Sequence, residues 1–465
     1  MALSRPWGRA AIRSVVIIGG GLAGLSAACA LADSGFAVTL CECRRLLGGR
    51  ASSLLLRGIE EPVDLCPHVL LRCCTHLLDF YRRLGITDRV RFLSRVGFLD
   101  RQGRLSWLGA GRLPAPLHLL PAFARLPFLG AADKRGVARA LVAMLRGPEA
   151  ADAPFAAWLA RQRQTPRAIE AFWRPLVVSA LNEEPERVST RYAFLVFRDG
   201  FLRHHAAYQV GIPTVPLSVL HGPPCRDYLA RRGARVLLKA PVRQVLVEGD
   251  RATGVRLEDG TSLRADWVIA AVPAAVLPDL LPPALAAAEP FAAARHLRPS
   301  PITALHLWFD RPVTPLDHAA LVDRTVQWVF VQDGGSRLSL VISASCSLVG
   351  RPRAEVLGRA LAEIREAFPA AREAHLRRSA VLHAPAATFS PAPGCDGCRP
   401  LAETPLPGLF LAGDWTRTGW PATMESAVRS GTRAAEAILK AAGCPRRLAP
   451  SEPPPAPLAR LLGGW

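Results

Sequence analysis

The chain has 465 residues, of which 50% are hydrophobic and 21% charged, and its formal net charge is +20. This length exceeds one compact core and predicts two structural units, while the composition excludes disordered, collagen-like and coiled-coil chains. Arg or Pro interrupts the longest apolar stretches before they reach the ~20 residues of a membrane span, so we expect no transmembrane helix. Eleven cysteines are too few for a disulfide scaffold, which favours a reducing cytoplasm.

Nearly all of the positive charge is arginine, because lysine occurs only at Lys134, Lys239 and Lys440. A GC-rich genome produces such a skew, so part of the charge is compositional. The arginines are spread along the chain without a zinc-finger, helix-turn-helix or RNA-binding signature, which argues against a nucleic-acid partner. An anionic membrane surface is the partner that the charge favours.

The N-terminal region predicts a βαβ unit. After a basic tail at residues 1–13, which we expect to be flexible, residues 15–18 predict a strand, 25–35 a helix and 36–42 a second strand. Strand and helix are joined by the motif Gly-x-Gly-x-x-Gly, with its glycines at Gly19, Gly21 and Gly24. These three positions permit, in turn, a tight turn, close approach of a pyrophosphate, and packing of the helix on the strand.

An acidic residue completes this dinucleotide signature. Glu42 ends the second strand, eighteen positions beyond Gly24, where its carboxylate can accept hydrogen bonds from both hydroxyls of an adenosine ribose. Gly49 and Arg50 follow closely and offer further phosphate contacts, since a guanidinium binds phosphate in a bidentate manner.

The rest of the chain predicts a mixed α+β region. We expect helices at residues 75–84, 137–145, 155–161, 169–180 and 423–442. We expect short strands at residues 236–238, 242–247, 254–257, 267–271, 303–309, 328–331, 338–344 and 409–412. The Pro-rich end, residues 444–465, is expected to be a flexible tail.

Residues 105–129 are rich in Leu and Pro, with prolines at 114, 116, 121 and 127 that argue against one continuous helix. We expect an interfacial hairpin or broken helices whose apolar side chains enter a bilayer. These are Trp107, Leu108, Leu113, Leu117, Leu119, Leu120, Phe123, Leu126, Phe128 and Leu129. Arg104, Arg112 and Arg125 are placed to meet lipid phosphates. The alternative is that these residues cover the core of the second unit.

Three distant segments resemble the superfamily of FAD-dependent amine oxidases and carotenoid desaturases. They are Gly48-Gly49-Arg50-Ala51, then Pro241-Val242 with 266–273, and finally Leu411-Ala412-Gly413-Asp414 with 419–427. The resemblance implies that Val242 contacts the adenine and that Gly413 and Asp414 bind the flavin ribityl chain. It places Thr423 and Met424 at a helix N-terminus facing the flavin pyrimidine edge. We expect the FAD to be non-covalent.

A narrower set of motifs is similar to the squalene-associated FAD-dependent desaturases, the hydroxysqualene dehydroxylase family. The motifs include Asp64-x-x-x-His68-Val69-Leu70-Leu71, the block 73–85, Phe172-Trp173-x-Pro175-Leu176 with Leu181-Asn182, and Gly413-Asp414-Trp415-Thr416-x-Thr418-Gly419-Trp420-Pro421. The family usually reads Asp-Asn-Gly-Gln-His where this chain has Asp64-Leu65-Cys66-Pro67-His68. This departure puts catalytic efficiency in question.

The resemblance implies an α/β fold with a Rossmann-type FAD-binding domain and a discontinuous, mixed α+β substrate domain, as in amine oxidases. We assign residues 14–75, 226–280 and 400–443 to the FAD-binding domain. Residues 76–225 and 281–399 are assigned to the substrate-binding domain.

The implied reaction is removal of the hydroxyl group of hydroxysqualene, a C30 isoprenoid, by reduced FAD in squalene and hopanoid synthesis. Candidate proton donors are Asp64, His68 and Glu425. Each has a structural alternative to catalysis: Asp64 as a loop cap, His68 as a packed histidine, and Glu425 as a charge that stabilises a helix N-terminus.

Two other functions remain open. One is an oxidative, phytoene-type isoprenoid desaturase with the opposite electron flow, and the other is a weakly active flavin-binding partner of a squalene-synthesising assembly. The sequence does not identify the electron donor. The single Cys-x-x-Cys at 395–398 predicts a loop, and no metal site is expected. We expect a protein on the cytoplasmic face of the membrane, because its substrate is insoluble in water.

Overall fold

The computed structural model describes residues 13–147 and 152–463. The predicted flexible tail at 1–13 lies almost wholly outside the described residues.

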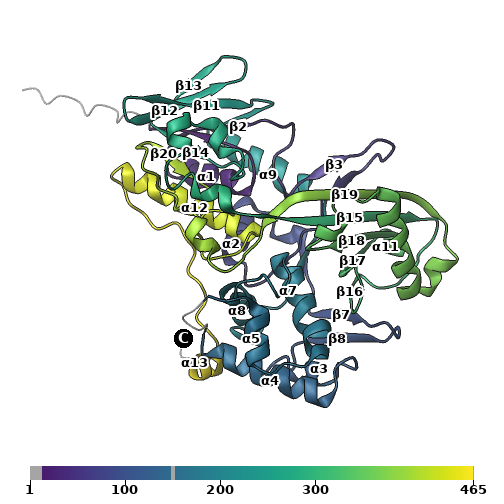
Figure 1. Ribbon diagram of the computed structural model, residues 1–465. Coiled ribbons are helices and arrows are strands. Elements are labelled where there is room, and N and C mark those ends of the chain that lie inside the picture. The colour runs from purple at the N-terminus through teal and green to yellow at the C-terminus, as the bar shows by residue number, and fades with distance from the viewer. Residues whose placement is uncertain (1–12, 148–151, 464–465) are drawn as a thin grey trace, which may run out of the picture.

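A five-stranded parallel sheet forms one end of the molecule (Figure 1). Its strands, in spatial order, are β10 (Arg235–Leu238), β2 (Ala37–Glu42), β1 (Ser14–Ile18), β14 (Trp267–Ala270) and β20 (Leu409–Leu411). Both faces are covered, as a parallel sheet requires. Val15 and Ile17 face one side and Val16 and Ile18 the other, so β1 reads as a continuous apolar run.

The two faces have different covers. Helices α1 (Leu22–Asp33), α2 (Thr75–Leu84), α9 (Leu217–Ala230) and α12 (Met424–Ala441) pack on the face that contains Val15. An antiparallel sheet of β11 (Val242–Glu248), β12 (Arg251–Leu257) and β13 (Ser262–Arg264) and the short helix α10 (Pro283–Ala286) cover the other face.

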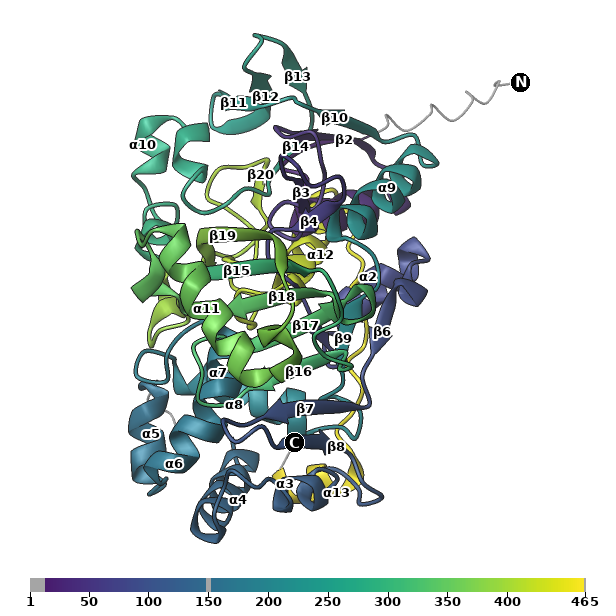
Figure 2. The ribbon, with the colours of Figure 1, turned by 90° about the vertical axis from the view of Figure 1, so that its right-hand side faces the viewer.

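A mixed seven-stranded sheet builds the second half of the molecule. Its order is β19 (Leu376–Phe389), β15 (Pro299–Phe309), β18 (Arg337–Ile342), β17 (Trp328–Gln332), β16 (His318–Leu321), β7 (Arg95–Leu99) and β8 (Leu105–Gly109). Helix α11 (Arg353–Ala367) covers one face (Figure 2), where Leu305, Leu338 and Leu340 are buried. Along β15 the opposite face carries Ile302 and Ala304, in the alternation expected of a strand.

Helices fill the space below this sheet and enclose an aromatic core that includes Trp158 and Trp173. They are α3 (Leu120–Ala124), α4 (Ala131–Leu145), α5 (Phe155–Arg161), α6 (Pro166–Ala168), α7 (Arg174–Leu181) and α8 (Thr190–Phe197). Helix α13 (Pro457–Gly463) contributes no residue to this core and packs against α4. A π-helical turn, Ile169–Trp173, joins α6 to α7.

Two small sheets lie between the halves. The hairpin of β3 (Ser53–Leu55) and β4 (Pro62–Asp64) leads into the loop 64–68. The sheet of β5 (Leu70–Leu71), β9 (Val210–Pro213) and β6 (Val90–Phe92) continues from it.

The α/β fold and the βαβ opening confirm the expected class, and the predicted helices at 75–84 and 155–161 have the bounds of α2 and α5. The core of the dinucleotide-binding half extends past two predicted domain boundaries, however. Helix α2 follows the boundary at residue 75, and the first turns of α9 precede the boundary at residue 226, yet Leu77, Phe80 and Leu217 are buried in one cluster with residues of α1. Their apolar faces therefore belong to the dinucleotide-binding half.

Two segments differ from the sequence prediction. Residues 105–109 form the edge strand β8 and only 120–124 are helical, with Phe123 buried. The C-terminal segment was expected to be flexible, but it ends in α13, in which Ala459 is fully buried. Within the described residues, no helix has the length and apolar composition needed to cross a bilayer.

Candidate functional site

The conformation of the phosphate loop requires glycine at two positions. Gly19 has φ +103°, and a Cβ there would lie 2.5 Å from the carbonyl oxygen of Ala271. A Cβ on Gly24 would lie 2.0 Å from the oxygen of Gly19. Both glycines are therefore required by the packing of β1, β14 and α1 on one another.

Gly21 is different, because the protein itself does not exclude a side chain there. Its φ of −75° suits any residue, and a Cβ would meet only the Cα of Gly49, at 3.9 Å. It is the N-cap of α1, whose first turn has no acidic residue, so free N–H groups and the positive helix end face this open space. The residues here fit a pyrophosphate, as the motif predicts.

Glu42 lies at the end of β2 and is 5% exposed. Its Oε2 accepts the N–H of Gly20 at 2.7 Å and its Oε1 accepts the N–H of Arg44 at 2.8 Å. Oε1 also accepts the weak thiol donor of Cys43 at 3.3 Å, whereas Oε2 keeps a second lone pair for a ribose hydroxyl. The N–H of Ala240 donates to the backbone oxygen of Glu42 at 2.9 Å, which brings the following Val242 to the same end of the sheet.

Arg50 and Asp414 were expected to bind different parts of the cofactor, but here they form an ion pair. Asp414 is buried at the end of β20, whereas Arg50 is half exposed. The second Nη of Arg50 donates to the carbonyl of Ala387 at 2.8 Å. The pair therefore joins the Gly49 turn, β19 and the Gly413 loop at one place, while their contacts to FAD stay predictions.

The Gly413 loop is held from beneath by a residue that the sequence analysis missed. Arg399 is fully buried, and its guanidinium donates to the carbonyls of Asp414 at 3.1 Å and Thr416 at 2.5 Å. Asp396 neutralises it at 3.1 Å. The Cys-x-x-Cys segment is a single 3₁₀ turn, and its Asp396 supplies the negative charge that balances Arg399. No sequence motif identifies this Arg399 clamp on the Gly413 loop.

Helix α12 begins beside the same loop. Thr423 caps it by accepting the N–H of Ser426 at 3.2 Å, and Met424 is its first residue. Ser426 and Ser430 bond back to Asp414 and Gly413 at 3.1 and 2.8 Å. The first-turn N–H groups of α12 are therefore placed at the Gly413 loop, where the positive helix end can face a cofactor.

Asp64 ends β4, and its Oδ1 accepts the hydroxyl of Ser53 at 2.7 Å and the N–H of Leu217 at 2.9 Å. Both bonds lower the pKa of this carboxyl, but its burial has the larger effect and raises the pKa above 3.8. Asp64 therefore has the loop-capping role, and this role uses Oδ1 but not Oδ2.

His68 donates its Nδ1 proton to the carbonyl of Cys66 at 2.7 Å, because a carbonyl can only accept. Nε2 then carries the lone pair of the neutral ring. Burial lowers the pKa of His68 below 6.5, while Asp64 acts to raise it. At neutral pH this ring is therefore a hydrogen-bond acceptor at Nε2 and not a strong acid.

Cys66 occupies the middle of the unusual stretch 65–67. It is buried with Ala304, Phe330 and Val341 on the seven-stranded sheet, and burial raises the pKa of its thiol to about 12. The side chain that stands where the family usually has glycine is therefore an inert apolar contact.

Two buried histidines that the sequence analysis did not single out brace these loops. His221 donates from Nδ1 to the carbonyl of Ala51 at 2.9 Å and accepts from the hydroxyl of Tyr81 at 2.9 Å. His306 bonds the carbonyl of Asp64 through Nε2 at 2.9 Å. Burial lowers the pKa of each to about 4, so both are neutral supports. Isolated histidines in α9 and β15 give no sequence signal.

Glu425 is 1% exposed, and its carboxylate points at α2. It accepts the N–H groups of His76 at 3.1 Å and Leu77 at 2.8 Å and pairs with Arg429 at 2.6 Å. These contacts cap α2 and lock it to α12. The geometry favours this positioning role over proton donation.

An apolar wall lies next to the loop 64–68. It is the face of the seven-stranded sheet that packs on Cys66, and it includes Ile302 and the rings of Trp328 and Phe330, stacked at 5.8 Å. Trp328 is only half-buried and is oriented by a 2.7 Å bond to the hydroxyl of Ser179. Apolar and aromatic side chains of this kind are typical of sites for hydrophobic ligands.

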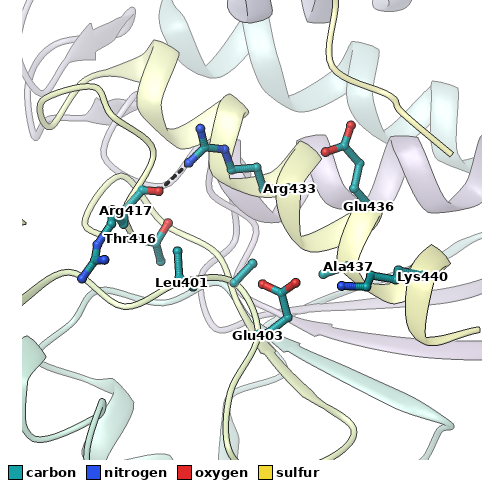
Figure 3. A pocket seen from close by; sticks show the side chains of 9 residues that line it. Leu401, Glu403, Thr416, Arg417, Arg433, Glu436, Ala437 and Lys440 are labelled. Carbon is teal, nitrogen blue, oxygen red and sulfur yellow. Dashed lines mark hydrogen bonds between the residues drawn. The ribbon is translucent and has the colours of Figure 1, made fainter. Parts of the chain in front are cut away.

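A shallow pocket of about 220 Å³ lies on the outer side of α12 and contains none of the predicted site residues (Figure 3). Arg433 bonds the carbonyl of Arg417 across it, and Glu436 accepts the N–H groups of Leu448 and Ala449. Arg433 and Glu436 are thus used structurally. Within residues 13–147 and 152–463, no group of three His, Cys, Asp or Glu side chains could hold a metal ion.

Comparison with known proteins agrees with this geometry. The family model described as flavin containing amine oxidoreductase matches residues 22–439. A hydroxysqualene dehydroxylase from Rhodopseudomonas palustris is 30% identical, with 92% of this chain and 99% of that protein aligned. A 15-cis-phytoene desaturase from Synechococcus elongatus is 27% identical, with 91% and 95% aligned.

Solved structures show the same fold. An oxidoreductase from Methanosarcina mazei superposes with a TM-score of 0.71 at 19% identity, covering 92% of this chain and all of that one. Cyclohexylamine oxidase from Brevibacterium oxydans superposes with a TM-score of 0.66 at 19% identity, covering 93% of this chain and all of that one. The resemblance carried by the sequence motifs is confirmed, and with it FAD as the cofactor.

Proposed function

Because the chain belongs to the family of flavin-containing amine oxidoreductases and is an FAD-dependent oxidoreductase, we propose that it removes the hydroxyl group of hydroxysqualene to form squalene. The observation that carries this proposal is the half-buried Asp64 carboxyl, two residues before Cys66, which packs on the apolar wall. Identity with the hydroxysqualene dehydroxylase over nearly the full length supports it.

The reaction needs one hydride and one proton: the C–O bond breaks, the protonated hydroxyl leaves as water, and hydride takes its place. Bound reduced FAD supplies the hydride. The proton comes from the chain, and Asp64 Oδ2 is the atom that holds it, because burial raises the pKa of this carboxyl. The carboxylate that remains stabilises the allylic cation of the substrate.

The neighbouring residues orient the substrate and exclude water. His68 offers Nε2 as an acceptor to the departing hydroxyl group or water. The wall of Ile302, Trp328 and Phe330 keeps nucleophiles from the cation, and the faces of the two aromatic rings stabilise positive charge.

An oxidative desaturation of the phytoene type is the second candidate, supported by the desaturase relative at 27% identity. Desaturation removes two hydrogens and needs no acid at a hydroxyl, so the raised pKa of the half-buried Asp64 favours dehydroxylation.

The deciding experiment uses the purified holoenzyme, reduced with dithionite without oxygen and mixed with detergent-dispersed hydroxysqualene. We expect one squalene for each flavin reoxidised. A parallel sample with oxidised FAD and phytoene should give no product. Desaturated phytoene without squalene would support the second candidate. Retained FAD with neither product would leave the flavin-binding partner as the remaining function.

A further inference from the structure

Six exposed large apolar side chains lie in or next to helices at the end of the molecule farthest from β11–β13. Figures 1 and 2 both place α3, α4 and α13 at this lower end. The side chains are Leu113 (40% exposed), Leu117 (40%), Leu120 (45%), Val142 (57%), Leu461 (80%) and Leu462 (49%). We call these six residues the leucine patch.

The consecutive residues Arg203, His204 and His205 connect the segments that carry the leucine patch. His205 Nε2 bonds the carbonyl of Gly111 at 3.0 Å, which holds the segment that carries Leu113 and Leu117. His204 bonds the carbonyl of Pro453 at 3.2 Å, and the carbonyl of Arg203 accepts the N–H of Ala456, the residue before α13, at 3.0 Å. Helix α13 also packs against α4. The patch is therefore built from segments fixed to one another and not from a loose tail.

The charges at this end are almost all positive. Arg112, Arg125, Arg135, Arg139, Arg146 and Arg460 are exposed. The only acidic residue in 101–147 is Asp133, which is buried and accepts the N–H of Gly130 at 2.8 Å. Arg135, Arg139 and Val142 follow one another at helical spacing, so arginines border the apolar residues on α4.

We propose that the leucine patch and its arginines dock the protein on an anionic lipid bilayer. Leucines bury their side chains at the acyl boundary and arginines meet phosphate groups above them, as in other peripheral proteins. The inference rests on the proposed function in one respect: a C30 isoprenoid dissolves in a bilayer, so an enzyme that uses it gains by docking there.

The patch keeps part of the anchor predicted from the sequence, since Leu113, Leu117 and Leu120 are exposed, but it does not include Trp107 or Phe123. Phe123 packs edge-on against Phe172, with ring centroids at 5.3 Å. Trp107 lies under Arg95 at 4.4 Å and beside His318 at 6.0 Å. Both side chains pack against other residues of the protein. Leu461, in the segment that the sequence predicts to be a flexible tail, is the most exposed member of the patch.

The test is co-sedimentation of the holoenzyme with vesicles of phosphatidylcholine alone or mixed with phosphatidylglycerol. We expect binding to the mixed vesicles, weaker at high salt because screening shortens the reach of the arginines. Leu117→Ser with Leu461→Ser and Leu462→Ser should reduce the partition coefficient at least ~10-fold, by loss of buried apolar area. Leu55→Ser with Leu401→Ser, equally exposed elsewhere (72% and 53%), should not change it.

A second pair tests the charges. Arg135→Gln with Arg139→Gln should weaken binding to the mixed vesicles and reduce its salt dependence. Arg353→Gln with Arg359→Gln, exposed on α11, should leave both unchanged. Equal binding by all variants would overturn the proposal, and so would a change in oligomeric state in place of vesicle binding. All variants should convert detergent-dispersed hydroxysqualene normally, so a wrong substrate assignment shows there and leaves the vesicle result intact.

Discussion

The phosphate loop and the loop 64–68 lie in the same candidate site but are built in opposite ways. The first depends on missing side chains, since a Cβ on Gly19 or Gly24 would overlap backbone oxygens. The second depends on side chains that are present: Asp64 holds Ser53 and Leu217, and Cys66 packs on the seven-stranded sheet. Backbone sterics leave a recognisable motif, whereas contacts between side chains tolerate substitution as long as the packing is kept.

Within the phosphate loop, a substitution at Gly21 should weaken FAD binding, whereas a substitution at Gly24 should reduce folding stability. Gly21→Val should weaken FAD binding by about 100-fold or more, since its side chain occupies the space of the pyrophosphate. The far-UV spectrum should stay unchanged, because the protein leaves room there. Flavin absorbance after gel filtration measures the loss, and FAD retained by a folded Gly21→Val would contradict the site.

Gly24→Ala is the contrasting variant. Its Cβ would lie 2.0 Å from a backbone oxygen, so we expect a loss of about 3 kcal/mol of folding stability. Equal stability of the two variants would remove the distinction.

In the loop 64–68, Asp64→Asn should reduce kcat about 10²- to 10⁴-fold by removing the proton donor, while FAD stays bound. The raised pKa of Asp64 means that the acid is protonated at low pH. The rate should therefore fall as pH rises through this pKa, and Asp64→Asn should lose that dependence. Asp79→Asn, on the surface of α2, is the matched control. An unchanged kcat in Asp64→Asn would assign the proton to another group.

Glu425→Gln tests the third sequence candidate for the acid. It leaves the buried Arg429 with a weaker partner and α2 with a weaker cap, so we expect about 3 kcal/mol less stability in chemical denaturation. The kcat of the folded fraction should not change. A large loss of kcat without loss of stability would return Glu425 to catalysis.

The smallest effect is expected at Cys66. Cys66→Gly restores the residue usual in the family but removes a buried contact with Phe330 and Val341 and adds backbone freedom. The melting temperature should fall by an amount equivalent to about 1 kcal/mol, with FAD binding unchanged. A gain in stability would show that the Cys66 side chain strains the loop.

Much of the dinucleotide-binding half could be predicted because its determinants are local. Gly19 to Glu42 lie within one βαβ unit, and α2 and α12 carry clear apolar periodicity. Strand β19 could not be predicted, since its polar and half-buried residues lack a strand's alternation. Helix α9 was also missed, because Pro223 and Pro224 lie inside it and packing on α1 outweighs their cost.

The sequence by itself determined the position of the phosphate loop, because Gly19, Gly21, Gly24 and Glu42 all lie within one βαβ unit, and its resemblance to a known superfamily indicated the cofactor class. Only the tertiary structure decided that Arg399 clamps the Gly413 loop and that Glu425 caps α2. It also decided that Cys66, in the loop 64–68, packs on an apolar wall built from β15, β17 and β18. The contacts of Glu425 and Cys66 join residues hundreds of positions apart, whereas the Arg399 clamp spans only 15 to 17 positions. All of them involve buried side chains, and no local sequence pattern signals burial.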